Sequence, residues 1–151
     1  MSNFESKNFG NIEFEDASVV VFPSGLPGFE ERRRFLALHF KESTPLIYLQ
    51  SLEEAGLCFV TLPVLSVEAG YQLCVCDDDL NALGLATGRQ PAIGSEVLCL
   101  AVVSLRESGI TANLLAPVVV NLQKRLAVQA VAPESSYSHQ HPLTTAEAIA
   151  C

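Results

Sequence analysis

Cysteine and histidine side chains stand close together at two places in this sequence and could bind a metal. Cys74 and Cys76 lie two residues apart, and His139 and His141 repeat that spacing near the end of the chain. A structural zinc site takes four ligands, usually from two pairs with Cys-x2–4-Cys spacing. The cysteines have no second pair, and the histidines have no acidic pattern beside them and are followed by Pro142. We therefore expect buried free thiols and a hydrogen-bonded histidine loop, with no metal and no other cofactor.

Three consecutive aspartates, Asp77-Asp78-Asp79, resemble the start of a calcium-binding loop. The residues that follow lack the alternating oxygen ligands, the central glycine and the closing glutamate of such a loop. Negative charge at a helix start is stabilising, so we interpret the run as the N-cap of a short helix over residues 80–83 that ends at Gly84. The sequence also contains no nucleophile elbow, phosphate-binding loop or dinucleotide fingerprint, so it predicts no enzyme.

The charge of the whole chain restricts its partners. Its 151 residues carry a formal net charge of −8, with only 9 Lys and Arg residues. Recognition of nucleic-acid phosphates needs a basic surface, so direct nucleic-acid binding is disfavoured and a basic protein partner is favoured. The first apolar run, at residues 19–22, is too short for a signal sequence or a membrane span. An odd number of cysteines does not indicate a disulfide framework, and we expect a cytoplasmic protein without membrane contact.

The elements that must position any site are predicted to be short strands. A hairpin with its turn at Gly10-Asn11 is followed by a Pro- and Gly-rich loop over residues 22–30. Further strands are expected over residues 18–22, 35–40, 46–49, 57–62, 71–75, 96–105, 112–122 and 126–132. These elements predict a mainly β fold, a small antiparallel barrel-like domain with one short helix. The domain is expected to span residues 1–143, and residues 144–151 are expected to form a flexible tail.

An apolar run surrounds Pro117 and has two interpretations. Leu114-Leu115-Ala116 precede the proline and Val118-Val119-Val120 follow it. Because proline donates no ladder hydrogen bond, the run could be an apolar edge segment that receives another chain by strand addition. It could equally be a core strand that begins at Pro117.

Four motifs in order resemble the FliW family. They are Phe22-Pro23-x-Gly25-Leu26-Pro27-Gly28-Phe29-Glu30, then Leu49-Gln50-Ser51, then residues 111–121 (TANLLAPVVVN), and Tyr137-Ser138 followed by His141-Pro142-Leu143. The similarity extends over residues 8–143. Leu62-Pro63 and Ala127 depart from the usual pattern, and residues 70–94 are the least similar stretch.

The resemblance implies a flagellar assembly factor with a compact β-barrel-like fold. Members of that family bind CsrA, a small dimeric RNA-binding repressor, and relieve its repression of flagellin translation. They also bind flagellin, so that CsrA and flagellin compete in a partner switch. A protein with a net charge of −8 is complementary to such a basic repressor.

Two groups of residues are candidates for contact with these partners. Acidic residues near the N-terminal hairpin, Glu13, Glu15 and Asp16, are expected to assist the encounter with CsrA. A second group is expected to line a groove for an apolar helix of flagellin, and consists of Asn113, Leu114, Leu115, Pro117, Tyr137, His141 and Pro142. The alternative function is a small β-barrel enzyme or ligand-binding protein with an internal pocket, in which His39 or His139 supplies a polar group.

Overall fold

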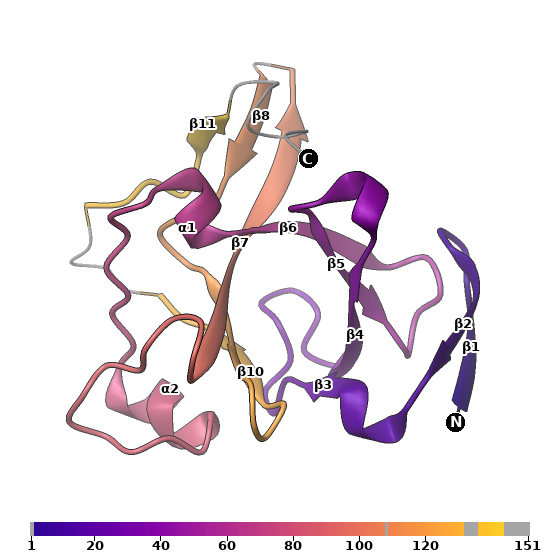
Figure 1. Ribbon diagram of the computed structural model, residues 1–151, viewed down its shortest axis with the longest axis horizontal. Helices are drawn as coiled ribbons and strands as arrows, with labels where there is room; N and C mark the ends of the chain where they lie inside the picture. The colour runs from indigo at the N-terminus through magenta and orange to yellow at the C-terminus, as the bar shows by residue number, and fades with distance from the viewer. Residues whose placement is uncertain (1, 108, 132–135, 144–151) are drawn as a thin grey trace.

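The computed structural model describes residues 2–107, 109–131 and 136–143 (Figure 1). The predicted tail, residues 144–151, lies outside the described residues. Within them the chain is mainly β, with two short α-helices, α1 (Val64–Val67) and α2 (Asp77–Ala82), and two 3-10 turns, η1 (Asp16–Ser18) and η2 (Lys41–Ser43). The strands are β1 (Ser2–Ser6), β2 (Gly10–Phe14), β3 (Val19–Val21), β4 (Arg34–His39), β5 (Ile47–Ser51), β6 (Cys58–Pro63), β7 (Val97–Arg106), β8 (Gly109–Ala112), β9 (Val118–Asn121), β10 (Ala127–Gln129) and β11 (His141–Leu143).

The main sheet is antiparallel and strongly curled (Figure 1). Its strands follow the order β10-β9-β7-β6-β5-β4-β3, while β8 pairs with the far half of β7 and with β11. The two ends of the sheet meet at a single isolated bridge between Val21 and Leu126. The predicted class, a mainly antiparallel β domain, is confirmed, but the barrel is not continuously closed.

The two faces of strand β7 pack in two different hydrophobic cores. Its odd-numbered residues Val97 and Cys99 pack with the helices, and its even-numbered Leu98 and Leu100 pack inside the curl of the sheet. Successive residues of a strand point to opposite faces, so a strand covered on both sides is apolar throughout. This explains why residues 96–105 form the long apolar run that predicted a central strand.

The N-terminal hairpin forms, but its turn is not where the sequence indicated. Ser6 pairs with Gly10, so the turn consists of residues 7–9 rather than Gly10-Asn11. Gly10 has a φ of +73°, the left-handed conformation that closes a hairpin loop of this length. The glycine is thus used at the end of the turn, which shifts the register from the predicted one.

The prediction for residues 71–84 was partly wrong. Residues 71–75 form no strand, because the side-chain amide of Gln90 takes the place of a neighbouring strand. The Val75 N–H donates to Gln90 Oε1 at 2.6 Å, and Gln90 Nε2 donates to the Val75 carbonyl at 3.0 Å. Helix α2 has Cys76 as its N-cap residue, without a side-chain cap, and the three aspartates fill its first turn. Gly84 ends it, at a φ of +74°. Helix α1 was not predicted.

Two further predictions are corrected by burial and pairing. Strand β9, which follows Pro117, pairs with β7 on one side and β10 on the other and is fully buried, so the edge-strip interpretation is wrong and the core-strand interpretation is confirmed. Cys74 and Cys76 are exposed rather than buried, because residues 71–76 lie on the surface with Tyr71, Leu73 and Val75 turned toward the core. Among the described residues, no helix is long and apolar enough to cross a membrane.

Candidate partner-binding surfaces

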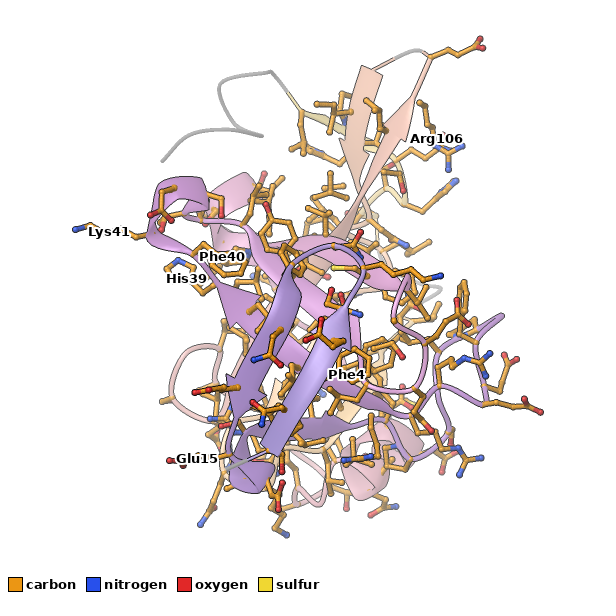
Figure 2. All side chains as sticks on the ribbon, turned by 90° about the vertical axis from the view of Figure 1, so that its right-hand side faces the viewer. Phe4, Glu15, His39, Phe40, Lys41 and Arg106 are labelled. Carbon is orange, nitrogen blue, oxygen red and sulfur yellow. The ribbon has the colours of Figure 1, made fainter. Side chains whose placement is uncertain are left out.

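The predicted acidic group lies at the N-terminal hairpin and is open to solvent. Glu13 is on β2, Glu15 precedes η1, and Asp16 begins η1; all three are exposed. Asp16 accepts a hydrogen bond from the Ser2 hydroxyl at 2.8 Å, which ties the start of β1 to the end of the hairpin. Figure 2, which looks onto the hairpin, shows Glu15 projecting outward at its end. A partner can reach these carboxylates without any rearrangement.

A buried polar network fixes the hairpin to the main sheet. Gln50, which is fully buried, accepts a hydrogen bond from the Ser6 hydroxyl at 2.8 Å and donates to the carbonyls of Ala55 and Leu57 at 3.2 Å. The Ser6 hydroxyl also accepts from the N–H groups of Asn8 and Phe9. The network thereby shapes the turn of the hairpin.

Aromatic rings complete the attachment of the hairpin. The ring of Phe9 lies 5.3 Å from that of Phe40 and 5.2 Å from that of Tyr48. Because the turn is held by both polar and apolar contacts, the acidic residues of the hairpin are presented from a defined position.

The structure brings the second predicted group together, but much of it is core. Residues 141–143 form β11 against β8, and the Leu114 N–H donates to the Ser138 carbonyl at 3.0 Å. Leu114 is 1% exposed and Pro117 is buried, so neither side chain can line a surface groove. Leu115 and His141 are half-buried. A surface groove could therefore be lined only by the accessible members of the group, such as Leu115, Tyr137 and Pro142.

Aromatic stacking and hydrogen bonds explain why this group is ordered. Tyr137 stacks on Tyr71 with ring centroids 4.3 Å apart, and the Tyr71 hydroxyl donates to the Leu114 carbonyl at 2.6 Å. Burial raises the pKa of Tyr71 well above its ordinary value, so the hydroxyl stays a donor at any physiological pH. Asn113 accepts from the N–H groups of Leu115 and Ala116 and so shapes the turn before Pro117. Of the two predicted residues on β11, His141 is half-buried and Pro142 is exposed. This group and the acidic hairpin lie at different ends of the molecule (Figure 1).

The interior of the curled sheet offers little room for a ligand. A cavity of about 80 Å³ lies there, lined by Leu26, Pro27, Phe29, Leu49, Phe59, Val102, Val118 and Gln129. Small-molecule sites usually measure roughly 300–1,000 Å³ and gather several polar groups. His39 and His139 are both exposed, and His39 is engaged with the Thr44 hydroxyl at 2.9 Å. The geometry thus gives no support to the alternative of an internal pocket.

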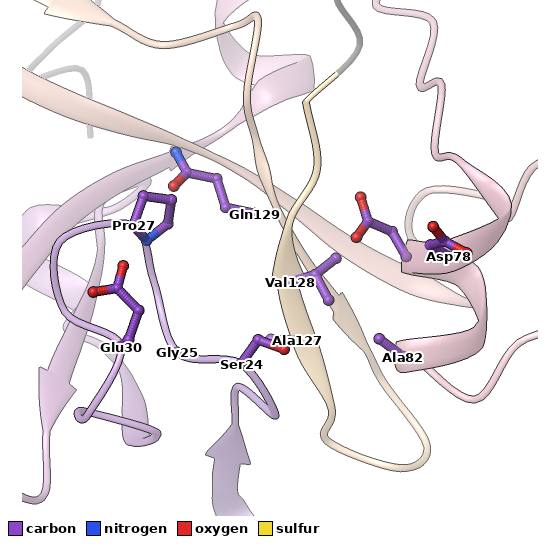
Figure 3. A pocket seen from close by; sticks show the side chains of 10 residues that line it. Ser24, Gly25, Pro27, Glu30, Asp78, Ala82, Ala127, Val128 and Gln129 are labelled. Carbon is purple, nitrogen blue, oxygen red and sulfur yellow. The ribbon is translucent and has the colours of Figure 1, made fainter.

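A larger hollow lies between three elements that are distant in sequence. It measures about 410 Å³ and is bounded by the loop at residues 22–30, the first turns of α2 and the strand β10 (Figure 3). The carboxylates of Glu30, Asp78 and Asp79 line it, and small apolar side chains such as Ala82 and Val128 form part of its wall. The sequence pattern indicated a loop, a helix start and a strand here, but not that they face one hollow.

The loop at residues 22–30 owes its shape to its glycines and to two buried anchors. Phe22 and Leu26 are buried in the core. Gly25 has a φ of +68°, and a Cβ there would lie 2.6 Å from backbone atoms of Glu30. Only glycine permits both the left-handed backbone and this close approach. The carboxylate of Glu30 in turn accepts a hydrogen bond from the Gly28 N–H at 2.7 Å. This bond stabilises the turn that places the carboxylate beside the hollow.

Ion pairs elsewhere on the surface hold loops rather than form a reactive site. Glu96 pairs with Arg89 and accepts the N–H of Ala92, and these hydrogen bonds lower the pKa of Glu96 to about 2. Glu53 accepts the N–H of Arg34 at 2.9 Å and that of Arg33, and these bonds also lower its pKa. Across residues 2–107, 109–131 and 136–143, no group of three or more His, Cys, Asp or Glu side chains is placed to hold a metal ion.

A curled antiparallel sheet with solvent-exposed carboxylates and a hollow on its surface defines a small antiparallel β domain. Comparison with known proteins agrees. A family model described as FliW protein matches residues 3–143. A flagellar assembly factor FliW of Natranaerobius thermophilus is 36% identical over 91% of this chain and 89% of its own length, and that of Clostridium botulinum is 28% identical over 97% and 99%.

A solved structure supports the same assignment. A crystal structure of the flagellar assembly factor FliW superposes with a TM-score of 0.81 and 30% sequence identity, and the match covers 95% of this chain and 97% of that one. The chain therefore belongs to the FliW family of flagellar assembly factors, which is not an enzyme family. The resemblance found in the four sequence motifs is confirmed.

Proposed function

We propose that this protein binds the translational regulator CsrA, relieves its repression of flagellin translation, and exchanges CsrA for flagellin in a partner switch in the cytoplasm. Membership of the FliW family is the observation that carries this proposal. The charge of −8 and the exposed carboxylates of the hairpin support it, because an RNA-binding partner must present positive charge.

The hairpin acts in the encounter. Glu13 and Glu15 are exposed side chains on a hairpin that is fixed to the main sheet, so they attract a basic partner over a distance of about a Debye length, roughly 8–10 Å at physiological salt. Such peripheral charges mainly change the association rate. Asp16 contributes charge while its carboxylate also holds Ser2.

The accessible part of the second group receives flagellin. Leu115 and Tyr137 are half-buried, and Pro142 is exposed, so together they present apolar surface beside a β-ladder. Apolar surface of this kind accommodates the apolar face of a helix. The separation of this surface from the hairpin means that exchange of the two partners would involve more than direct overlap at one site.

The test is a titration of the purified protein with CsrA, repeated with flagellin present. We expect CsrA to bind, flagellin to lower its apparent affinity, and the association rate to fall as salt rises. Glu13→Lys with Glu15→Lys should slow association roughly tenfold at low salt. The matched control is Glu68→Lys with Glu107→Lys, which reverses two exposed carboxylates away from the hairpin. Equal rates for both pairs would remove the hairpin from the encounter, and no CsrA binding by the unaltered protein would refute the proposal itself.

A second variant addresses flagellin. Leu115→Asp should abolish capture of flagellin while the circular dichroism spectrum is retained. Leu105→Asp serves as the control, because Leu105 is 83% exposed on the protruding half of β7. Normal capture by folded Leu115→Asp would show that flagellin binds elsewhere.

A further inference from the structure

The curled sheet has an open seam where its two end strands approach each other. Val21 N–H donates to the Arg125 carbonyl at 2.9 Å, and the Val21–Leu126 bridge is the one contact of this kind between the ends within the described residues. Beyond it the chain turns away, since the Gly25 N–H donates to the Phe22 carbonyl at 2.9 Å and closes a turn, and Pro23 has no N–H. Strand β10 therefore continues past the bridge without a strand from the described residues on its outer side.

The hydrogen-bond register shows which groups of β10 face this seam. The Leu126 carbonyl accepts from the Asn121 N–H at 2.7 Å, and the Ala130 N–H donates to the Pro117 carbonyl at 2.9 Å. The even-numbered residues from 126 to 130, in and beside β10, thus direct their backbone groups toward β9. In an antiparallel ladder, alternate residues direct them to opposite sides. The N–H and carbonyl of Gln129 consequently point away from β9, into the seam.

The hollow of about 410 Å³ borders the same edge, and all of its charged lining residues are acidic. Of the ten residues that line it, Glu30, Asp78 and Asp79 carry carboxylates and none carries a positive charge (Figure 3). None of these three carboxylates takes part in the ion pairs found among the described residues. The aspartates come from the first turn of α2 and Glu30 from the loop, so the charges stand on both sides of β10.

We propose that the seam binds an extended basic segment of a partner protein, which adds as a strand to the free edge of β10 and places Lys or Arg side chains against Glu30, Asp78 and Asp79. An exposed strand edge offers backbone hydrogen bonds, and flanking pockets select alternate side chains of the added strand. This inference rests on the proposed function, because the segment is assigned to the basic RNA-binding partner. The hairpin then serves the encounter, and the seam retains the bound partner.

The charge arm of the test compares adjacent aspartates. Asp78→Asn with Asp79→Asn should weaken CsrA binding about tenfold, mainly by faster dissociation, because charges in the bound interface govern the off-rate. The control is Asp77→Asn, because Asp77 lies in the same helical turn but does not line the hollow. The affinity of this variant for CsrA should change less than about twofold. If Asp77→Asn weakens binding as much per removed charge as the double variant does, the inference is overturned, because long-range attraction alone would then explain both effects.

The backbone arm tests strand addition directly. Gln129→Pro removes an N–H that the β10–β9 ladder does not use, so the variant should fold but bind CsrA more weakly than Gln129→Ala, which removes the side-chain bond to the Ala116 carbonyl alone. Amide exchange at Gln129 should slow in the complex. If Gln129→Pro does not fold, this exchange measurement on the unaltered protein decides: unchanged exchange overturns strand addition.

The results separate this inference from the proposed function. Failure of the unaltered protein to bind CsrA refutes the proposed function. Normal binding of CsrA by all the seam variants refutes only the seam. Loss of flagellin binding with intact CsrA binding would also refute it, because the segment in the seam would then belong to flagellin.

Discussion

Replacement of Gln50 by leucine should destabilise the protein by about 2–4 kcal/mol, because it leaves a buried hydroxyl without its acceptor. Gln50 is fully buried and Ser6 is 6% exposed, and their side chains are joined by a hydrogen bond of 2.8 Å. An unsatisfied buried polar group costs about 1–3 kcal/mol, and each lost hydrogen bond contributes about 0.5–1.5 kcal/mol more. The carbonyls of Ala55 and Leu57 each keep a backbone donor, so they add little to the loss.

The assay is thermal and urea unfolding of Gln50→Leu beside a surface control. For a chain of 151 residues, the expected loss lowers the Tm by roughly 5–15 °C. Gln123→Leu makes the same chemical change at an exposed position and should alter stability by less than about 0.5 kcal/mol.

A double-mutant cycle with Ser6→Ala isolates the pair. The double variant should lose less stability than the sum of the two single losses, because removal of both partners leaves no orphaned hydroxyl. A loss below about 1 kcal/mol for Gln50→Leu, or full additivity with Ser6→Ala, would refute the reasoning.

Three further predictions concern the loops and the thiols. Gly25→Ala should destabilise more than Gly28→Ala, since both have positive φ but only at Gly25 does an added Cβ meet backbone, at 2.6 Å; equal losses of urea midpoint would contradict this. The pKa of Glu96, lowered to about 2, gives stability that is present above about pH 4.5 and lost as the pH falls toward 2, so Glu96→Gln should flatten the acid limb of a pH–stability curve. A thiol reagent should label exposed Cys74 rapidly and Cys99 only on unfolding, because burial raises the pKa of Cys99 to about 12; comparable rates by mass spectrometry would refute the burial.

Several features of the fold were accessible from local sequence patterns. The apolar run of β7, the anchors of the loop at residues 22–30 and the helix end at Gly84 follow from side-chain alternation and from glycine's backbone freedom. The wrong strand at residues 71–75 shows where such patterns fail. Tyr71 and Val75 alternate as a strand would, but a distant side chain, Gln90, satisfies the backbone of Val75 in place of a partner strand.

The candidate surfaces divide in the same way. The acidity of the hairpin follows from local residue types, and in the structure Glu13 is exposed. The accessibility of Leu114 and Pro117 could not be predicted, because burial depends on which strands cover them. The hollow beside β10 had only a weak signal, a run of acidic residues with no basic neighbour.

The sequence by itself determined the charge, the β class and, through four motifs, the family, because these depend on residue types and on short spacings. Only the tertiary structure decided that the sheet leaves a seam, that Gln129 turns its backbone outward there, and that Glu30, Asp78 and Asp79 line one hollow beside β10. Residues 30, 78 and 129 are brought together by the curl of the sheet, and no local pattern encodes where the two ends of a curled sheet meet.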